Sequence, residues 1–235
     1  MSLREPAVET LDFIAGARAA RGVAVVIDVF RAFTVACYAF AAGAARIIPV
    51  AEIETARRLQ REHPQFVTLG ERHARKLEGF DFGNSPTHIE SQDFAGRTLV
   101  HTTHAGTQGL IHATQADVVL TGSLANAAAI CRYIGVLSPA TVSLVRMGQD
   151  ARERCAEDDL CAELLAARLR GASFDISTIK TRLRNAPSAA KFFDPEATWA
   201  PERDFELCTN ADRFDFVLRL VPGAEGAAYL RKLAA

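Results

Sequence analysis

Short apolar runs rich in valine and isoleucine recur along the 235-residue chain, with amphipathic or alanine-rich stretches between them. Near-continuous apolar runs of this kind are typical of strands buried on both faces of a sheet. The pattern predicts strands over residues 23–29, 46–50, 66–70, 98–101, 117–122 and 141–146. A later run, 214–221, alternates apolar and polar residues, so we expect an edge strand with one solvent-facing side there.

Helical periodicity fills the gaps between these runs. Residues 51–62 place Ile53, Ala56 and Leu59 on one face, and further helices are predicted over 31–42, 106–115, 124–134 and 157–169. Because strand and helix alternate, we expect an α/β fold, a three-layer sandwich with a mostly parallel sheet and helices on both faces. Residues 171–204 are more polar and contain three prolines, which indicates irregular structure or a lid-like insertion.

No internal repeat or Pro/Gly-rich linker divides the chain, so we expect a single α/β domain over residues 1–235, with two closely packed lobes as the alternative. The formal net charge of −1 favours neither nucleic acid nor an anionic membrane. The N-terminal residues do not form a signal peptide, and no apolar stretch approaches the roughly 20 residues that a membrane span needs. Five cysteines without a CxxC pair indicate reduced thiols in a cytoplasmic protein.

Polar motifs follow the predicted strands, and ligands of such sheets bind beyond the carboxyl ends of the strands. Asp28 ends the most hydrophobic strand, where a carboxylate serves either as a metal ligand or catalytic acid, or as a helix cap. Arg31 follows near the start of a helix and either grips a phosphate bidentately or pairs with Asp28. Thr34 adds a hydroxyl on the same side of that helix.

The second motif joins GER at residues 70–72 to GFDFGNSP at residues 79–86. Glu71 and Asp81 offer the hard oxygen ligands that suit Mg²⁺. Positive residues lie beside the same loop, and we include Arg72 among the candidate phosphate ligands. Asn84 and Ser85 either bind the anion or form an Asx-turn before Pro86.

The third motif, TTHAGT, closes a strand and opens a helix. Hydroxyls and a glycine at a helix N-terminus favour anion binding, which makes candidates of Thr102, Thr103, Gly106 and Thr107. His101 and His104 act as acid or base, or are structural.

Two further motifs begin helices. In GSLANA, Ser123 and Asn126 are either ligands or caps. In the acidic run of residues 157–159, the carboxylates either complement the helix dipole or supply a magnesium ligand, with Asp158 as the candidate.

In this order, VVIDVFRA, GER, GFDFGNSP, TTHAGT, GSLANA and EDDLCA together resemble the 2-phosphosulfolactate phosphatase family of magnesium-dependent acid phosphatases. The resemblance covers roughly residues 23–171, with a weaker echo over 208–221. It implies an α/β fold with a mixed sheet, Mg²⁺ as cofactor, and a small phosphorylated hydroxy acid, sulfonated in the family, as substrate. It assigns catalysis to Asp28, Arg31, Glu71 and Asp81, and metal binding to Asp28, Glu71 and Asp81 with Asp158 or Glu157 in reserve.

The chain departs from the family pattern at three positions: Phe33 interrupts a run of hydroxyl residues, Ala105 replaces an asparagine and Gln108 replaces an arginine. These changes leave open a non-catalytic anion-binding paralogue, and a magnesium-dependent transferase on the same scaffold is a third alternative. The oligomeric state is open as well, with a homodimer as the default expectation because two-fold dimers are the commonest soluble oligomers.

Overall fold

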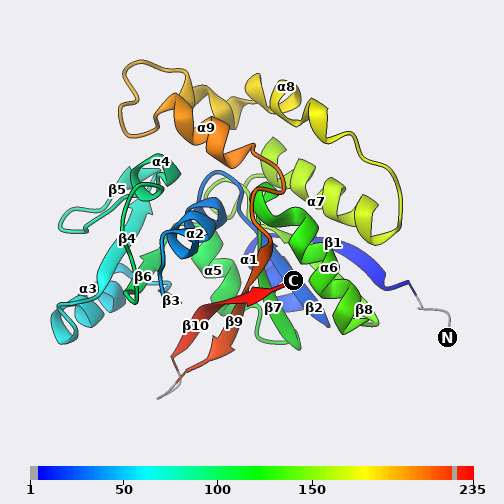
Figure 1. Ribbon diagram of the computed structural model, residues 1–235, viewed down its shortest axis with the longest axis horizontal. Coiled ribbons are helices and arrows are strands. Elements are labelled where there is room, and N and C mark those ends of the chain that lie inside the picture. Colours follow the sequence, from blue (N-terminus) through cyan, green and yellow to red (C-terminus); the bar gives the residue numbers. More distant parts are fainter. Residues whose placement is uncertain (1–4, 224–226) are drawn as a thin grey trace.

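The computed structural model describes residues 5–223 and 227–235, and its strands form one ten-stranded mixed sheet (Figure 1). From one edge to the other the strands are β1 (Ala7–Asp12), β8 (Thr141–Arg146), β2 (Val23–Ile27), β7 (Val118–Gly122), β9 (Phe216–Pro222), β10 (Ala228–Ala234), β3 (Arg46–Pro49), β6 (Thr98–Thr102), β4 (Val67–Arg72) and β5 (Arg75–Lys76). The six apolar runs predicted as buried strands are β2, β3, β4, β6, β7 and β8, so those predictions are confirmed.

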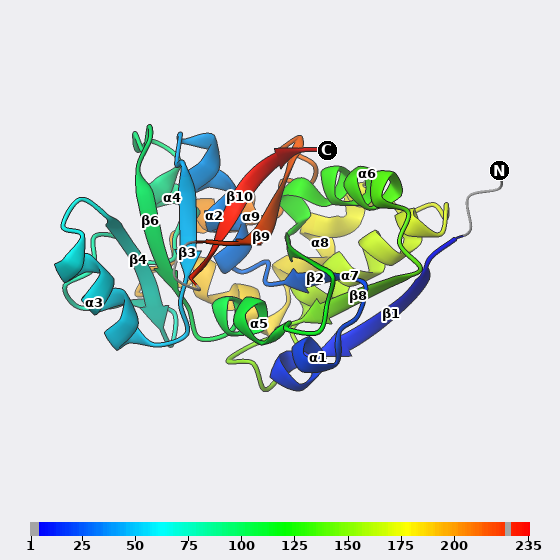
Figure 2. The ribbon, with the colours of Figure 1, turned by 90° about the horizontal axis from the view of Figure 1, so that it is seen from below.

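The sheet consists of two parallel blocks that run in opposite directions. Strands β1, β8, β2 and β7 pair in parallel, as do β3, β6 and β4, and the antiparallel hairpin β9–β10 lies between the blocks. The hairpin joins each block over a short length: β10 meets β3 at Leu230–Ile47, and β7 meets β9 at Val119–Leu220 and Leu120–Arg219. Figure 2 shows the hairpin crossing between the two blocks, which are turned relative to each other. This turn lets strands of opposite direction deliver their carboxyl ends to one cavity.

Helices cover both faces because β2 is apolar on both sides. Val25 and Ile27 pack in a cluster with α6 (Ala127–Leu137) and α7 (Ala156–Leu169). Ala24 and Val26 pack in a second cluster with α1 (Phe13–Ala19), α2 (Ala32–Ala41) and α5 (Gly106–His112). A smaller cluster joins α3 (Ile53–Glu62) to β6. The predicted three-layer α/β sandwich and its five helices are confirmed.

Residues 171–204, expected to be irregular or a lid-like insertion, combine irregular stretches with short helical elements. They contain the 3₁₀-helices Ile176–Thr178 and Pro187–Phe192, helix α8 (Ile179–Arg184) and the start of α9 (Glu202–Cys208). Ile179, Leu183 and Phe192 are buried, so apolar side chains anchor these short turns to the α7 side of the sheet. In Figure 1 they lie above α2 and α7, and Pro187, Ser188, Lys191 and Trp199 line the cavity described below. The segment is thus irregular in part, over residues 171–175 and 193–201, and its position beside the cavity fits the lid-like alternative.

The prediction of an edge strand at residues 214–221 is wrong, because β9 lies inside the sheet between β7 and β10. Val217 and Leu218 are buried in β9. The Arg219 guanidinium donates to the Tyr133 hydroxyl at 3.3 Å, so this polar residue of β9 has a hydrogen-bond partner within the fold. The true edges include β1, which the hydrophobic pattern did not reveal because AVETLD is partly exposed along its length. Within residues 5–223 and 227–235, no helix is long and apolar enough to cross a bilayer.

Candidate active site

A cavity of about 380 Å³ lies where both parallel blocks end, a volume that suits a small-molecule ligand. Asp28 reaches it from the end of β2, Glu71 from β4, His104 from the loop after β6, and Gly148 from the end of β8. Helix α7 adds Glu157 and Asp158. The walls therefore come from segments distributed over most of the chain, as expected for a site at strand ends.

The Asp28 carboxylate is buried at the junction of β2 and α2. Its Oδ1 accepts a hydrogen bond from the Ala32 amide at 3.2 Å, so the side chain satisfies a free amide in the first turn of α2 and also lines the cavity. A Cβ atom at Gly106 would lie 2.7 Å from Asp28 Oδ2, so a larger residue at that position would displace the Asp28 carboxylate. Burial, helped by the nearby Glu71 and Glu157 carboxylates, raises the pKa of Asp28 to about 7, although the hydrogen bond from the Ala32 amide and the charge of Lys191 act in the opposite direction.

Glu71 and Asp158 each hold two loops together through backbone amides. Glu71 accepts from the Ala74 amide at 2.7 Å and from the His104 amide at 2.8 Å. Asp158 accepts from the Val29 and Gly148 amides, both at 2.8 Å. Burial, together with the Asp28 and Glu157 charges, raises the pKa of Asp158 well above its usual range. The two carboxylates thus fix the loops around the cavity and line it with acidic oxygens.

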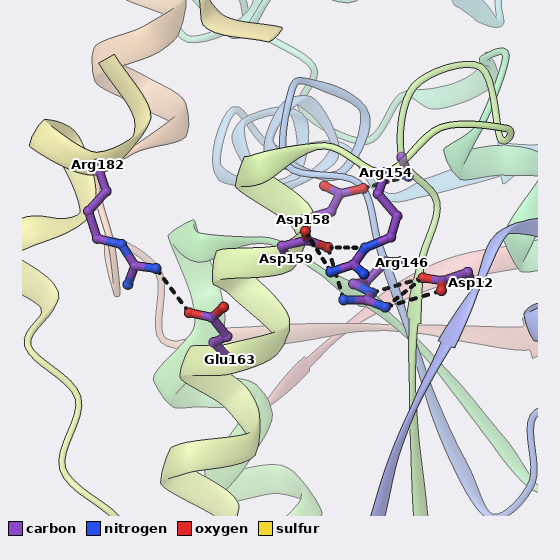
Figure 3. A network of polar contacts seen from close by, with 8 residues as sticks. Asp12, Arg146, Arg154, Asp158, Asp159, Glu163 and Arg182 are labelled. Atoms are coloured by element: carbon purple, nitrogen blue, oxygen red, sulfur yellow. Dashed lines mark hydrogen bonds and ion pairs between the residues drawn. The ribbon is translucent and has the colours of Figure 1, made fainter. Parts of the chain in front are cut away.

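A network of arginines and carboxylates orients the start of α7 (Figure 3). The Arg146 guanidinium donates to Asp12 and to Asp159, each at 2.9 Å, and Arg154 donates to Asp159 at 2.8 Å. Asp159 is therefore turned toward β1 and β8. Its neighbours Glu157 and Asp158 are left to line the cavity.

Two cations face these carboxylates. Arg31 is buried and donates to Asp204 at 2.7 Å, to the Trp199 carbonyl at 3.0 Å and to the Ala74 carbonyl at 3.1 Å. Lys191 lines the cavity from the lid-like segment, and burial together with the positive charge of Arg31 lowers its pKa. The sequence analysis did not identify Lys191, Trp199 or Asp204 as site residues, because residues 171–204 carry no motif at a strand end. The expected lid-like insertion over these residues was the one sequence feature that pointed toward the cavity.

The structure does not bring Asp81 to the cavity. Its side chain is exposed on the loop after β5 and accepts hydrogen bonds from the Thr68 amide at 2.7 Å and the Thr68 hydroxyl at 2.8 Å. The contact pins the GFDFGNSP loop to β4, which is a structural role. From the same loop Asn84 does line the cavity, whereas the Ser85 hydroxyl donates to Asp204 at 2.7 Å beneath it.

The hydroxyl candidates are buried in local hydrogen bonds and are absent from the residues that line the cavity. The Thr107 hydroxyl accepts from the Thr103 amide at 2.9 Å, and the Thr103 hydroxyl accepts from the Thr107 amide at 3.1 Å. These amides, which were predicted to bind an anion, are therefore already paired within the loop. The other contacts are Arg72 donating to Thr102, Thr34 donating to the Val29 carbonyl, and Ser123 donating to Asn126. These residues shape the loops that carry Asp28, Glu71 and His104.

The two histidines of the third motif occupy different environments. His101 is buried in β6, where its Nε2 lies 3.3 Å from Asn84 Oδ1, and burial lowers its pKa to about 4. His104 lines the cavity. An acid–base role is therefore compatible with the position of His104 and not with that of His101.

The comparison with known families agrees with this architecture. The family model described as 2-phosphosulpholactate phosphatase matches residues 9–223. The chain belongs to this family. The resemblance inferred from its motifs is confirmed, and it extends beyond the motif-bearing residues to β1, the lid-like segment and β9.

Curated relatives cover most of the chain. A protein of Caldanaerobacter subterraneus subsp. tengcongensis is 39% identical over 214 residues, which span 85% of this chain and 88% of the relative. One of Parasynechococcus marenigrum is 36% identical over 222 residues, 86% of this chain and 90% of the relative. One of Thermotoga petrophila is 33% identical over 212 residues, 85% and 89% of the two chains. Each carries the name "Probable 2-phosphosulfolactate phosphatase".

Proposed function

We propose that this family member is a magnesium-dependent phosphatase that hydrolyses a small phosphomonoester of the 2-phosphosulfolactate kind. The observation that carries the proposal is one cavity in which the carboxylates of Asp28, Glu157 and Asp158 face the cations Arg31 and Lys191. Carboxylates bind a divalent cation, and arginine and lysine bind phosphate oxygens. The names of the relatives supply the substrate class.

The donor set of the cavity fits magnesium. Asp28, Glu157 and Asp158 offer carboxylate oxygens, the ligands that Mg²⁺ prefers. The raised pKa values of Asp28 and Asp158 reflect burial beside like charges, which a divalent cation would offset. We assign the metal to these three residues together with the cavity-facing Glu71, and we leave out Asp81 because it lies on the outer side of its loop. When bound, magnesium supplies charge neutralisation at phosphoryl oxygens and a lower pKa for a coordinated water.

The remaining side chains bind and enclose the substrate. Lys191 and Arg31 hold anionic oxygens, and Asp204 fixes the direction of the Arg31 guanidinium through a buried ion pair. Trp199 and Ser188 line the cavity from the lid-like segment. Where these groups displace water from a bound substrate, the electrostatic interactions inside the cavity become stronger.

The three departures from the family pattern fall mostly outside the cavity. Phe33 is buried in the apolar cluster around α2, and the Gln108 amide donates to the Ala51 carbonyl at 3.1 Å. Ala105 alone of the three lines the cavity. The carboxylates and cations that carry the proposal are intact, which favours an enzyme over a non-catalytic paralogue.

Release of inorganic phosphate tests the proposal. The EDTA-treated protein is assayed on 2-phosphosulfolactate, 2-phospholactate and phosphoglycolate, with and without added Mg²⁺, beside the Asp28→Asn variant. We expect turnover that needs Mg²⁺ and falls by at least 100-fold in Asp28→Asn. Binding of these compounds without any phosphate release would instead support the anion-binding paralogue, and phosphate transfer to an added alcohol would support a transferase.

A further inference from the structure

Two histidines and an aspartate from three separate loops converge at the cavity. The candidate ligand atoms of His73, His104 and Asp150 all lie within 4.8 Å of one another. His104 Nδ1 is 3.3 Å from Asp150 Oδ1, and the rings of His73 and His104 meet edge to face with centroids 4.9 Å apart. All three residues line the cavity, with His73 exposed and the other two half-buried, so the cluster stands at the mouth.

We propose that His73, His104 and Asp150 form a second cation site, selective for a borderline transition metal such as Zn²⁺ over Mg²⁺. Imidazole nitrogen is a favoured ligand of zinc, whereas magnesium prefers oxygen alone. Ligand atoms about 2.0–2.1 Å from a tetrahedral zinc lie about 3.4 Å from each other. The separation of 3.3 Å between His104 Nδ1 and Asp150 Oδ1 matches that edge. The site is distinct from the carboxylate group deeper in the cavity.

His104 Nδ1, one of the three candidate ligand atoms, has no hydrogen-bond partner among the described residues. The atom is also shielded from solvent. His104 Nδ1 lies close to the Asp150 carboxylate but is not aligned to form a hydrogen bond with it. This arrangement is expected when a nitrogen and an oxygen both direct a lone pair at the same metal ion. A buried unpaired ring nitrogen is otherwise unfavourable, so a bound cation removes a cost.

The backbone holds the ligands inward. His73 and Ala74 adopt φ values of 51° and 61° in the turn between β4 and β5, and Asp150 and Ala151 adopt 53° and 54° after β8. These left-handed conformations are uncommon for residues other than glycine and gather at functional sites. The Glu71 carboxylate accepts from the amides of Ala74 and His104, so a single side chain locks together the two histidine-bearing loops.

Three protein ligands leave a coordination position open, in contrast to the closed four-ligand sets of structural zinc sites. Since all three residues line the cavity, the open position faces its interior. The bound ion therefore takes an anionic oxygen of whatever molecule occupies the cavity. This inference does not depend on the proposed phosphatase activity.

Zinc titration tests the site on the whole EDTA-stripped chain. Zn²⁺ alone is titrated against a chromophoric chelator, with Mg²⁺ in excess to occupy oxygen-only sites. We expect one equivalent of tightly bound zinc in the unchanged protein and at least tenfold weaker binding in each of His73→Gln, His104→Gln and Asp150→Asn. His88→Gln, which alters an exposed histidine on α4 (Pro86–Ile89), should bind zinc like the unchanged protein.

The thiol of Cys155 also lines the cavity and is the main competitor for zinc. Cys155→Ser should retain the tight site, and Co²⁺ in place of zinc should show ligand-field bands without thiolate charge transfer. Zinc binding that survives the three ligand variants, or that disappears in Cys155→Ser, would overturn the proposal, as would displacement of zinc by Mg²⁺. Thermal unfolding of the metal-free variants serves as the folding check, and exposed His73 provides the variant least able to disturb the fold.

Discussion

Arg31 and Asp204 lie 2.7 Å apart in an ion pair that is buried on both sides, although they are separated by 173 positions in the chain. Asp204 also accepts from the Ser85 hydroxyl and from the amide and hydroxyl of Thr87. One carboxylate thus joins the start of α2, the GFDFGNSP loop and α9. The pair couples the stability of the fold to the direction of a cavity-facing cation.

Replacing Asp204 by asparagine should destabilise the protein by about 3–5 kcal/mol, because it leaves the buried Arg31 charge uncompensated. Urea unfolding at pH 7 measures the change. Glu206 lies on α9 like Asp204 and forms an exposed pair with Lys180 of α8, so Glu206→Gln should cost no more than about 1 kcal/mol. Equal effects of the two substitutions would show that Arg31 is solvated in solution.

Asp28→Asn should stabilise the metal-free protein above neutral pH although it lowers turnover by at least 100-fold. Native Asp28 keeps its proton up to about pH 7, whereas the unfolded chain releases it near 3.8. The native state therefore binds more protons between these values, and stability attributable to Asp28 falls as the pH rises from about 4 to 7. Asparagine imitates the protonated form and does not incur that loss.

Urea unfolding in EDTA at pH 5 and pH 8 measures this effect, with Asp117→Asn, an exposed carboxylate at the start of β7, as the matched control. The stability of Asp28→Asn relative to the unchanged protein should grow from pH 5 to pH 8, and that of the control should not. A difference that is independent of pH would mean that Asp28 is ionised throughout.

His101 should destabilise the fold under mild acid. Burial lowers the pKa of native His101 to about 4 from 6.5, so the unfolded chain binds the extra proton between these values. Stability is then present above pH 6.5 and lost as the pH falls toward 4. His101→Gln should flatten this part of the stability profile, whereas substitution of the exposed His63 by glutamine should leave it unchanged. A native His101 resonance that titrates near pH 6.5 by NMR would contradict the expectation.

The strands and the positions of Asp28 and Glu71 follow from the sequence because each depends on a local rule: an apolar run, then a polar residue where it ends. The position of Asp158 follows from a second local rule, since acidic residues favour the first turn of a helix. The opposite direction of the two parallel blocks does not follow from the sequence, because it depends on the pairing of β9 and β10 with strands far away in the chain. Asp81 and Thr103 show the same limit. Their residue types suit a ligand site, yet their side chains turn to Thr68 and Thr107, a choice made by loop geometry that spacing alone does not reveal.

Lys191 should contribute to substrate binding more than to turnover. It is a cation contributed to the cavity by the lid-like segment, and a hydrogen bond from a charged group contributes about 1.5–3 kcal/mol. Lys191→Met keeps much of the apolar stem and removes the charge, so KM should rise about 10–150-fold while kcat changes less. Because burial and Arg31 lower the pKa of Lys191, KM of the unchanged protein should also begin to rise at a pH below that at which an ordinary lysine titrates.

Steady-state phosphate release across a pH series measures both effects of Lys191. Lys180→Met on the exposed face of α8 is the control and should leave KM and its pH dependence unchanged. A Lys191→Met variant with the KM of the unchanged protein and a lower kcat would place the lysine at the reacting phosphoryl group instead, because an interaction formed only in the transition state lowers kcat without weakening substrate binding.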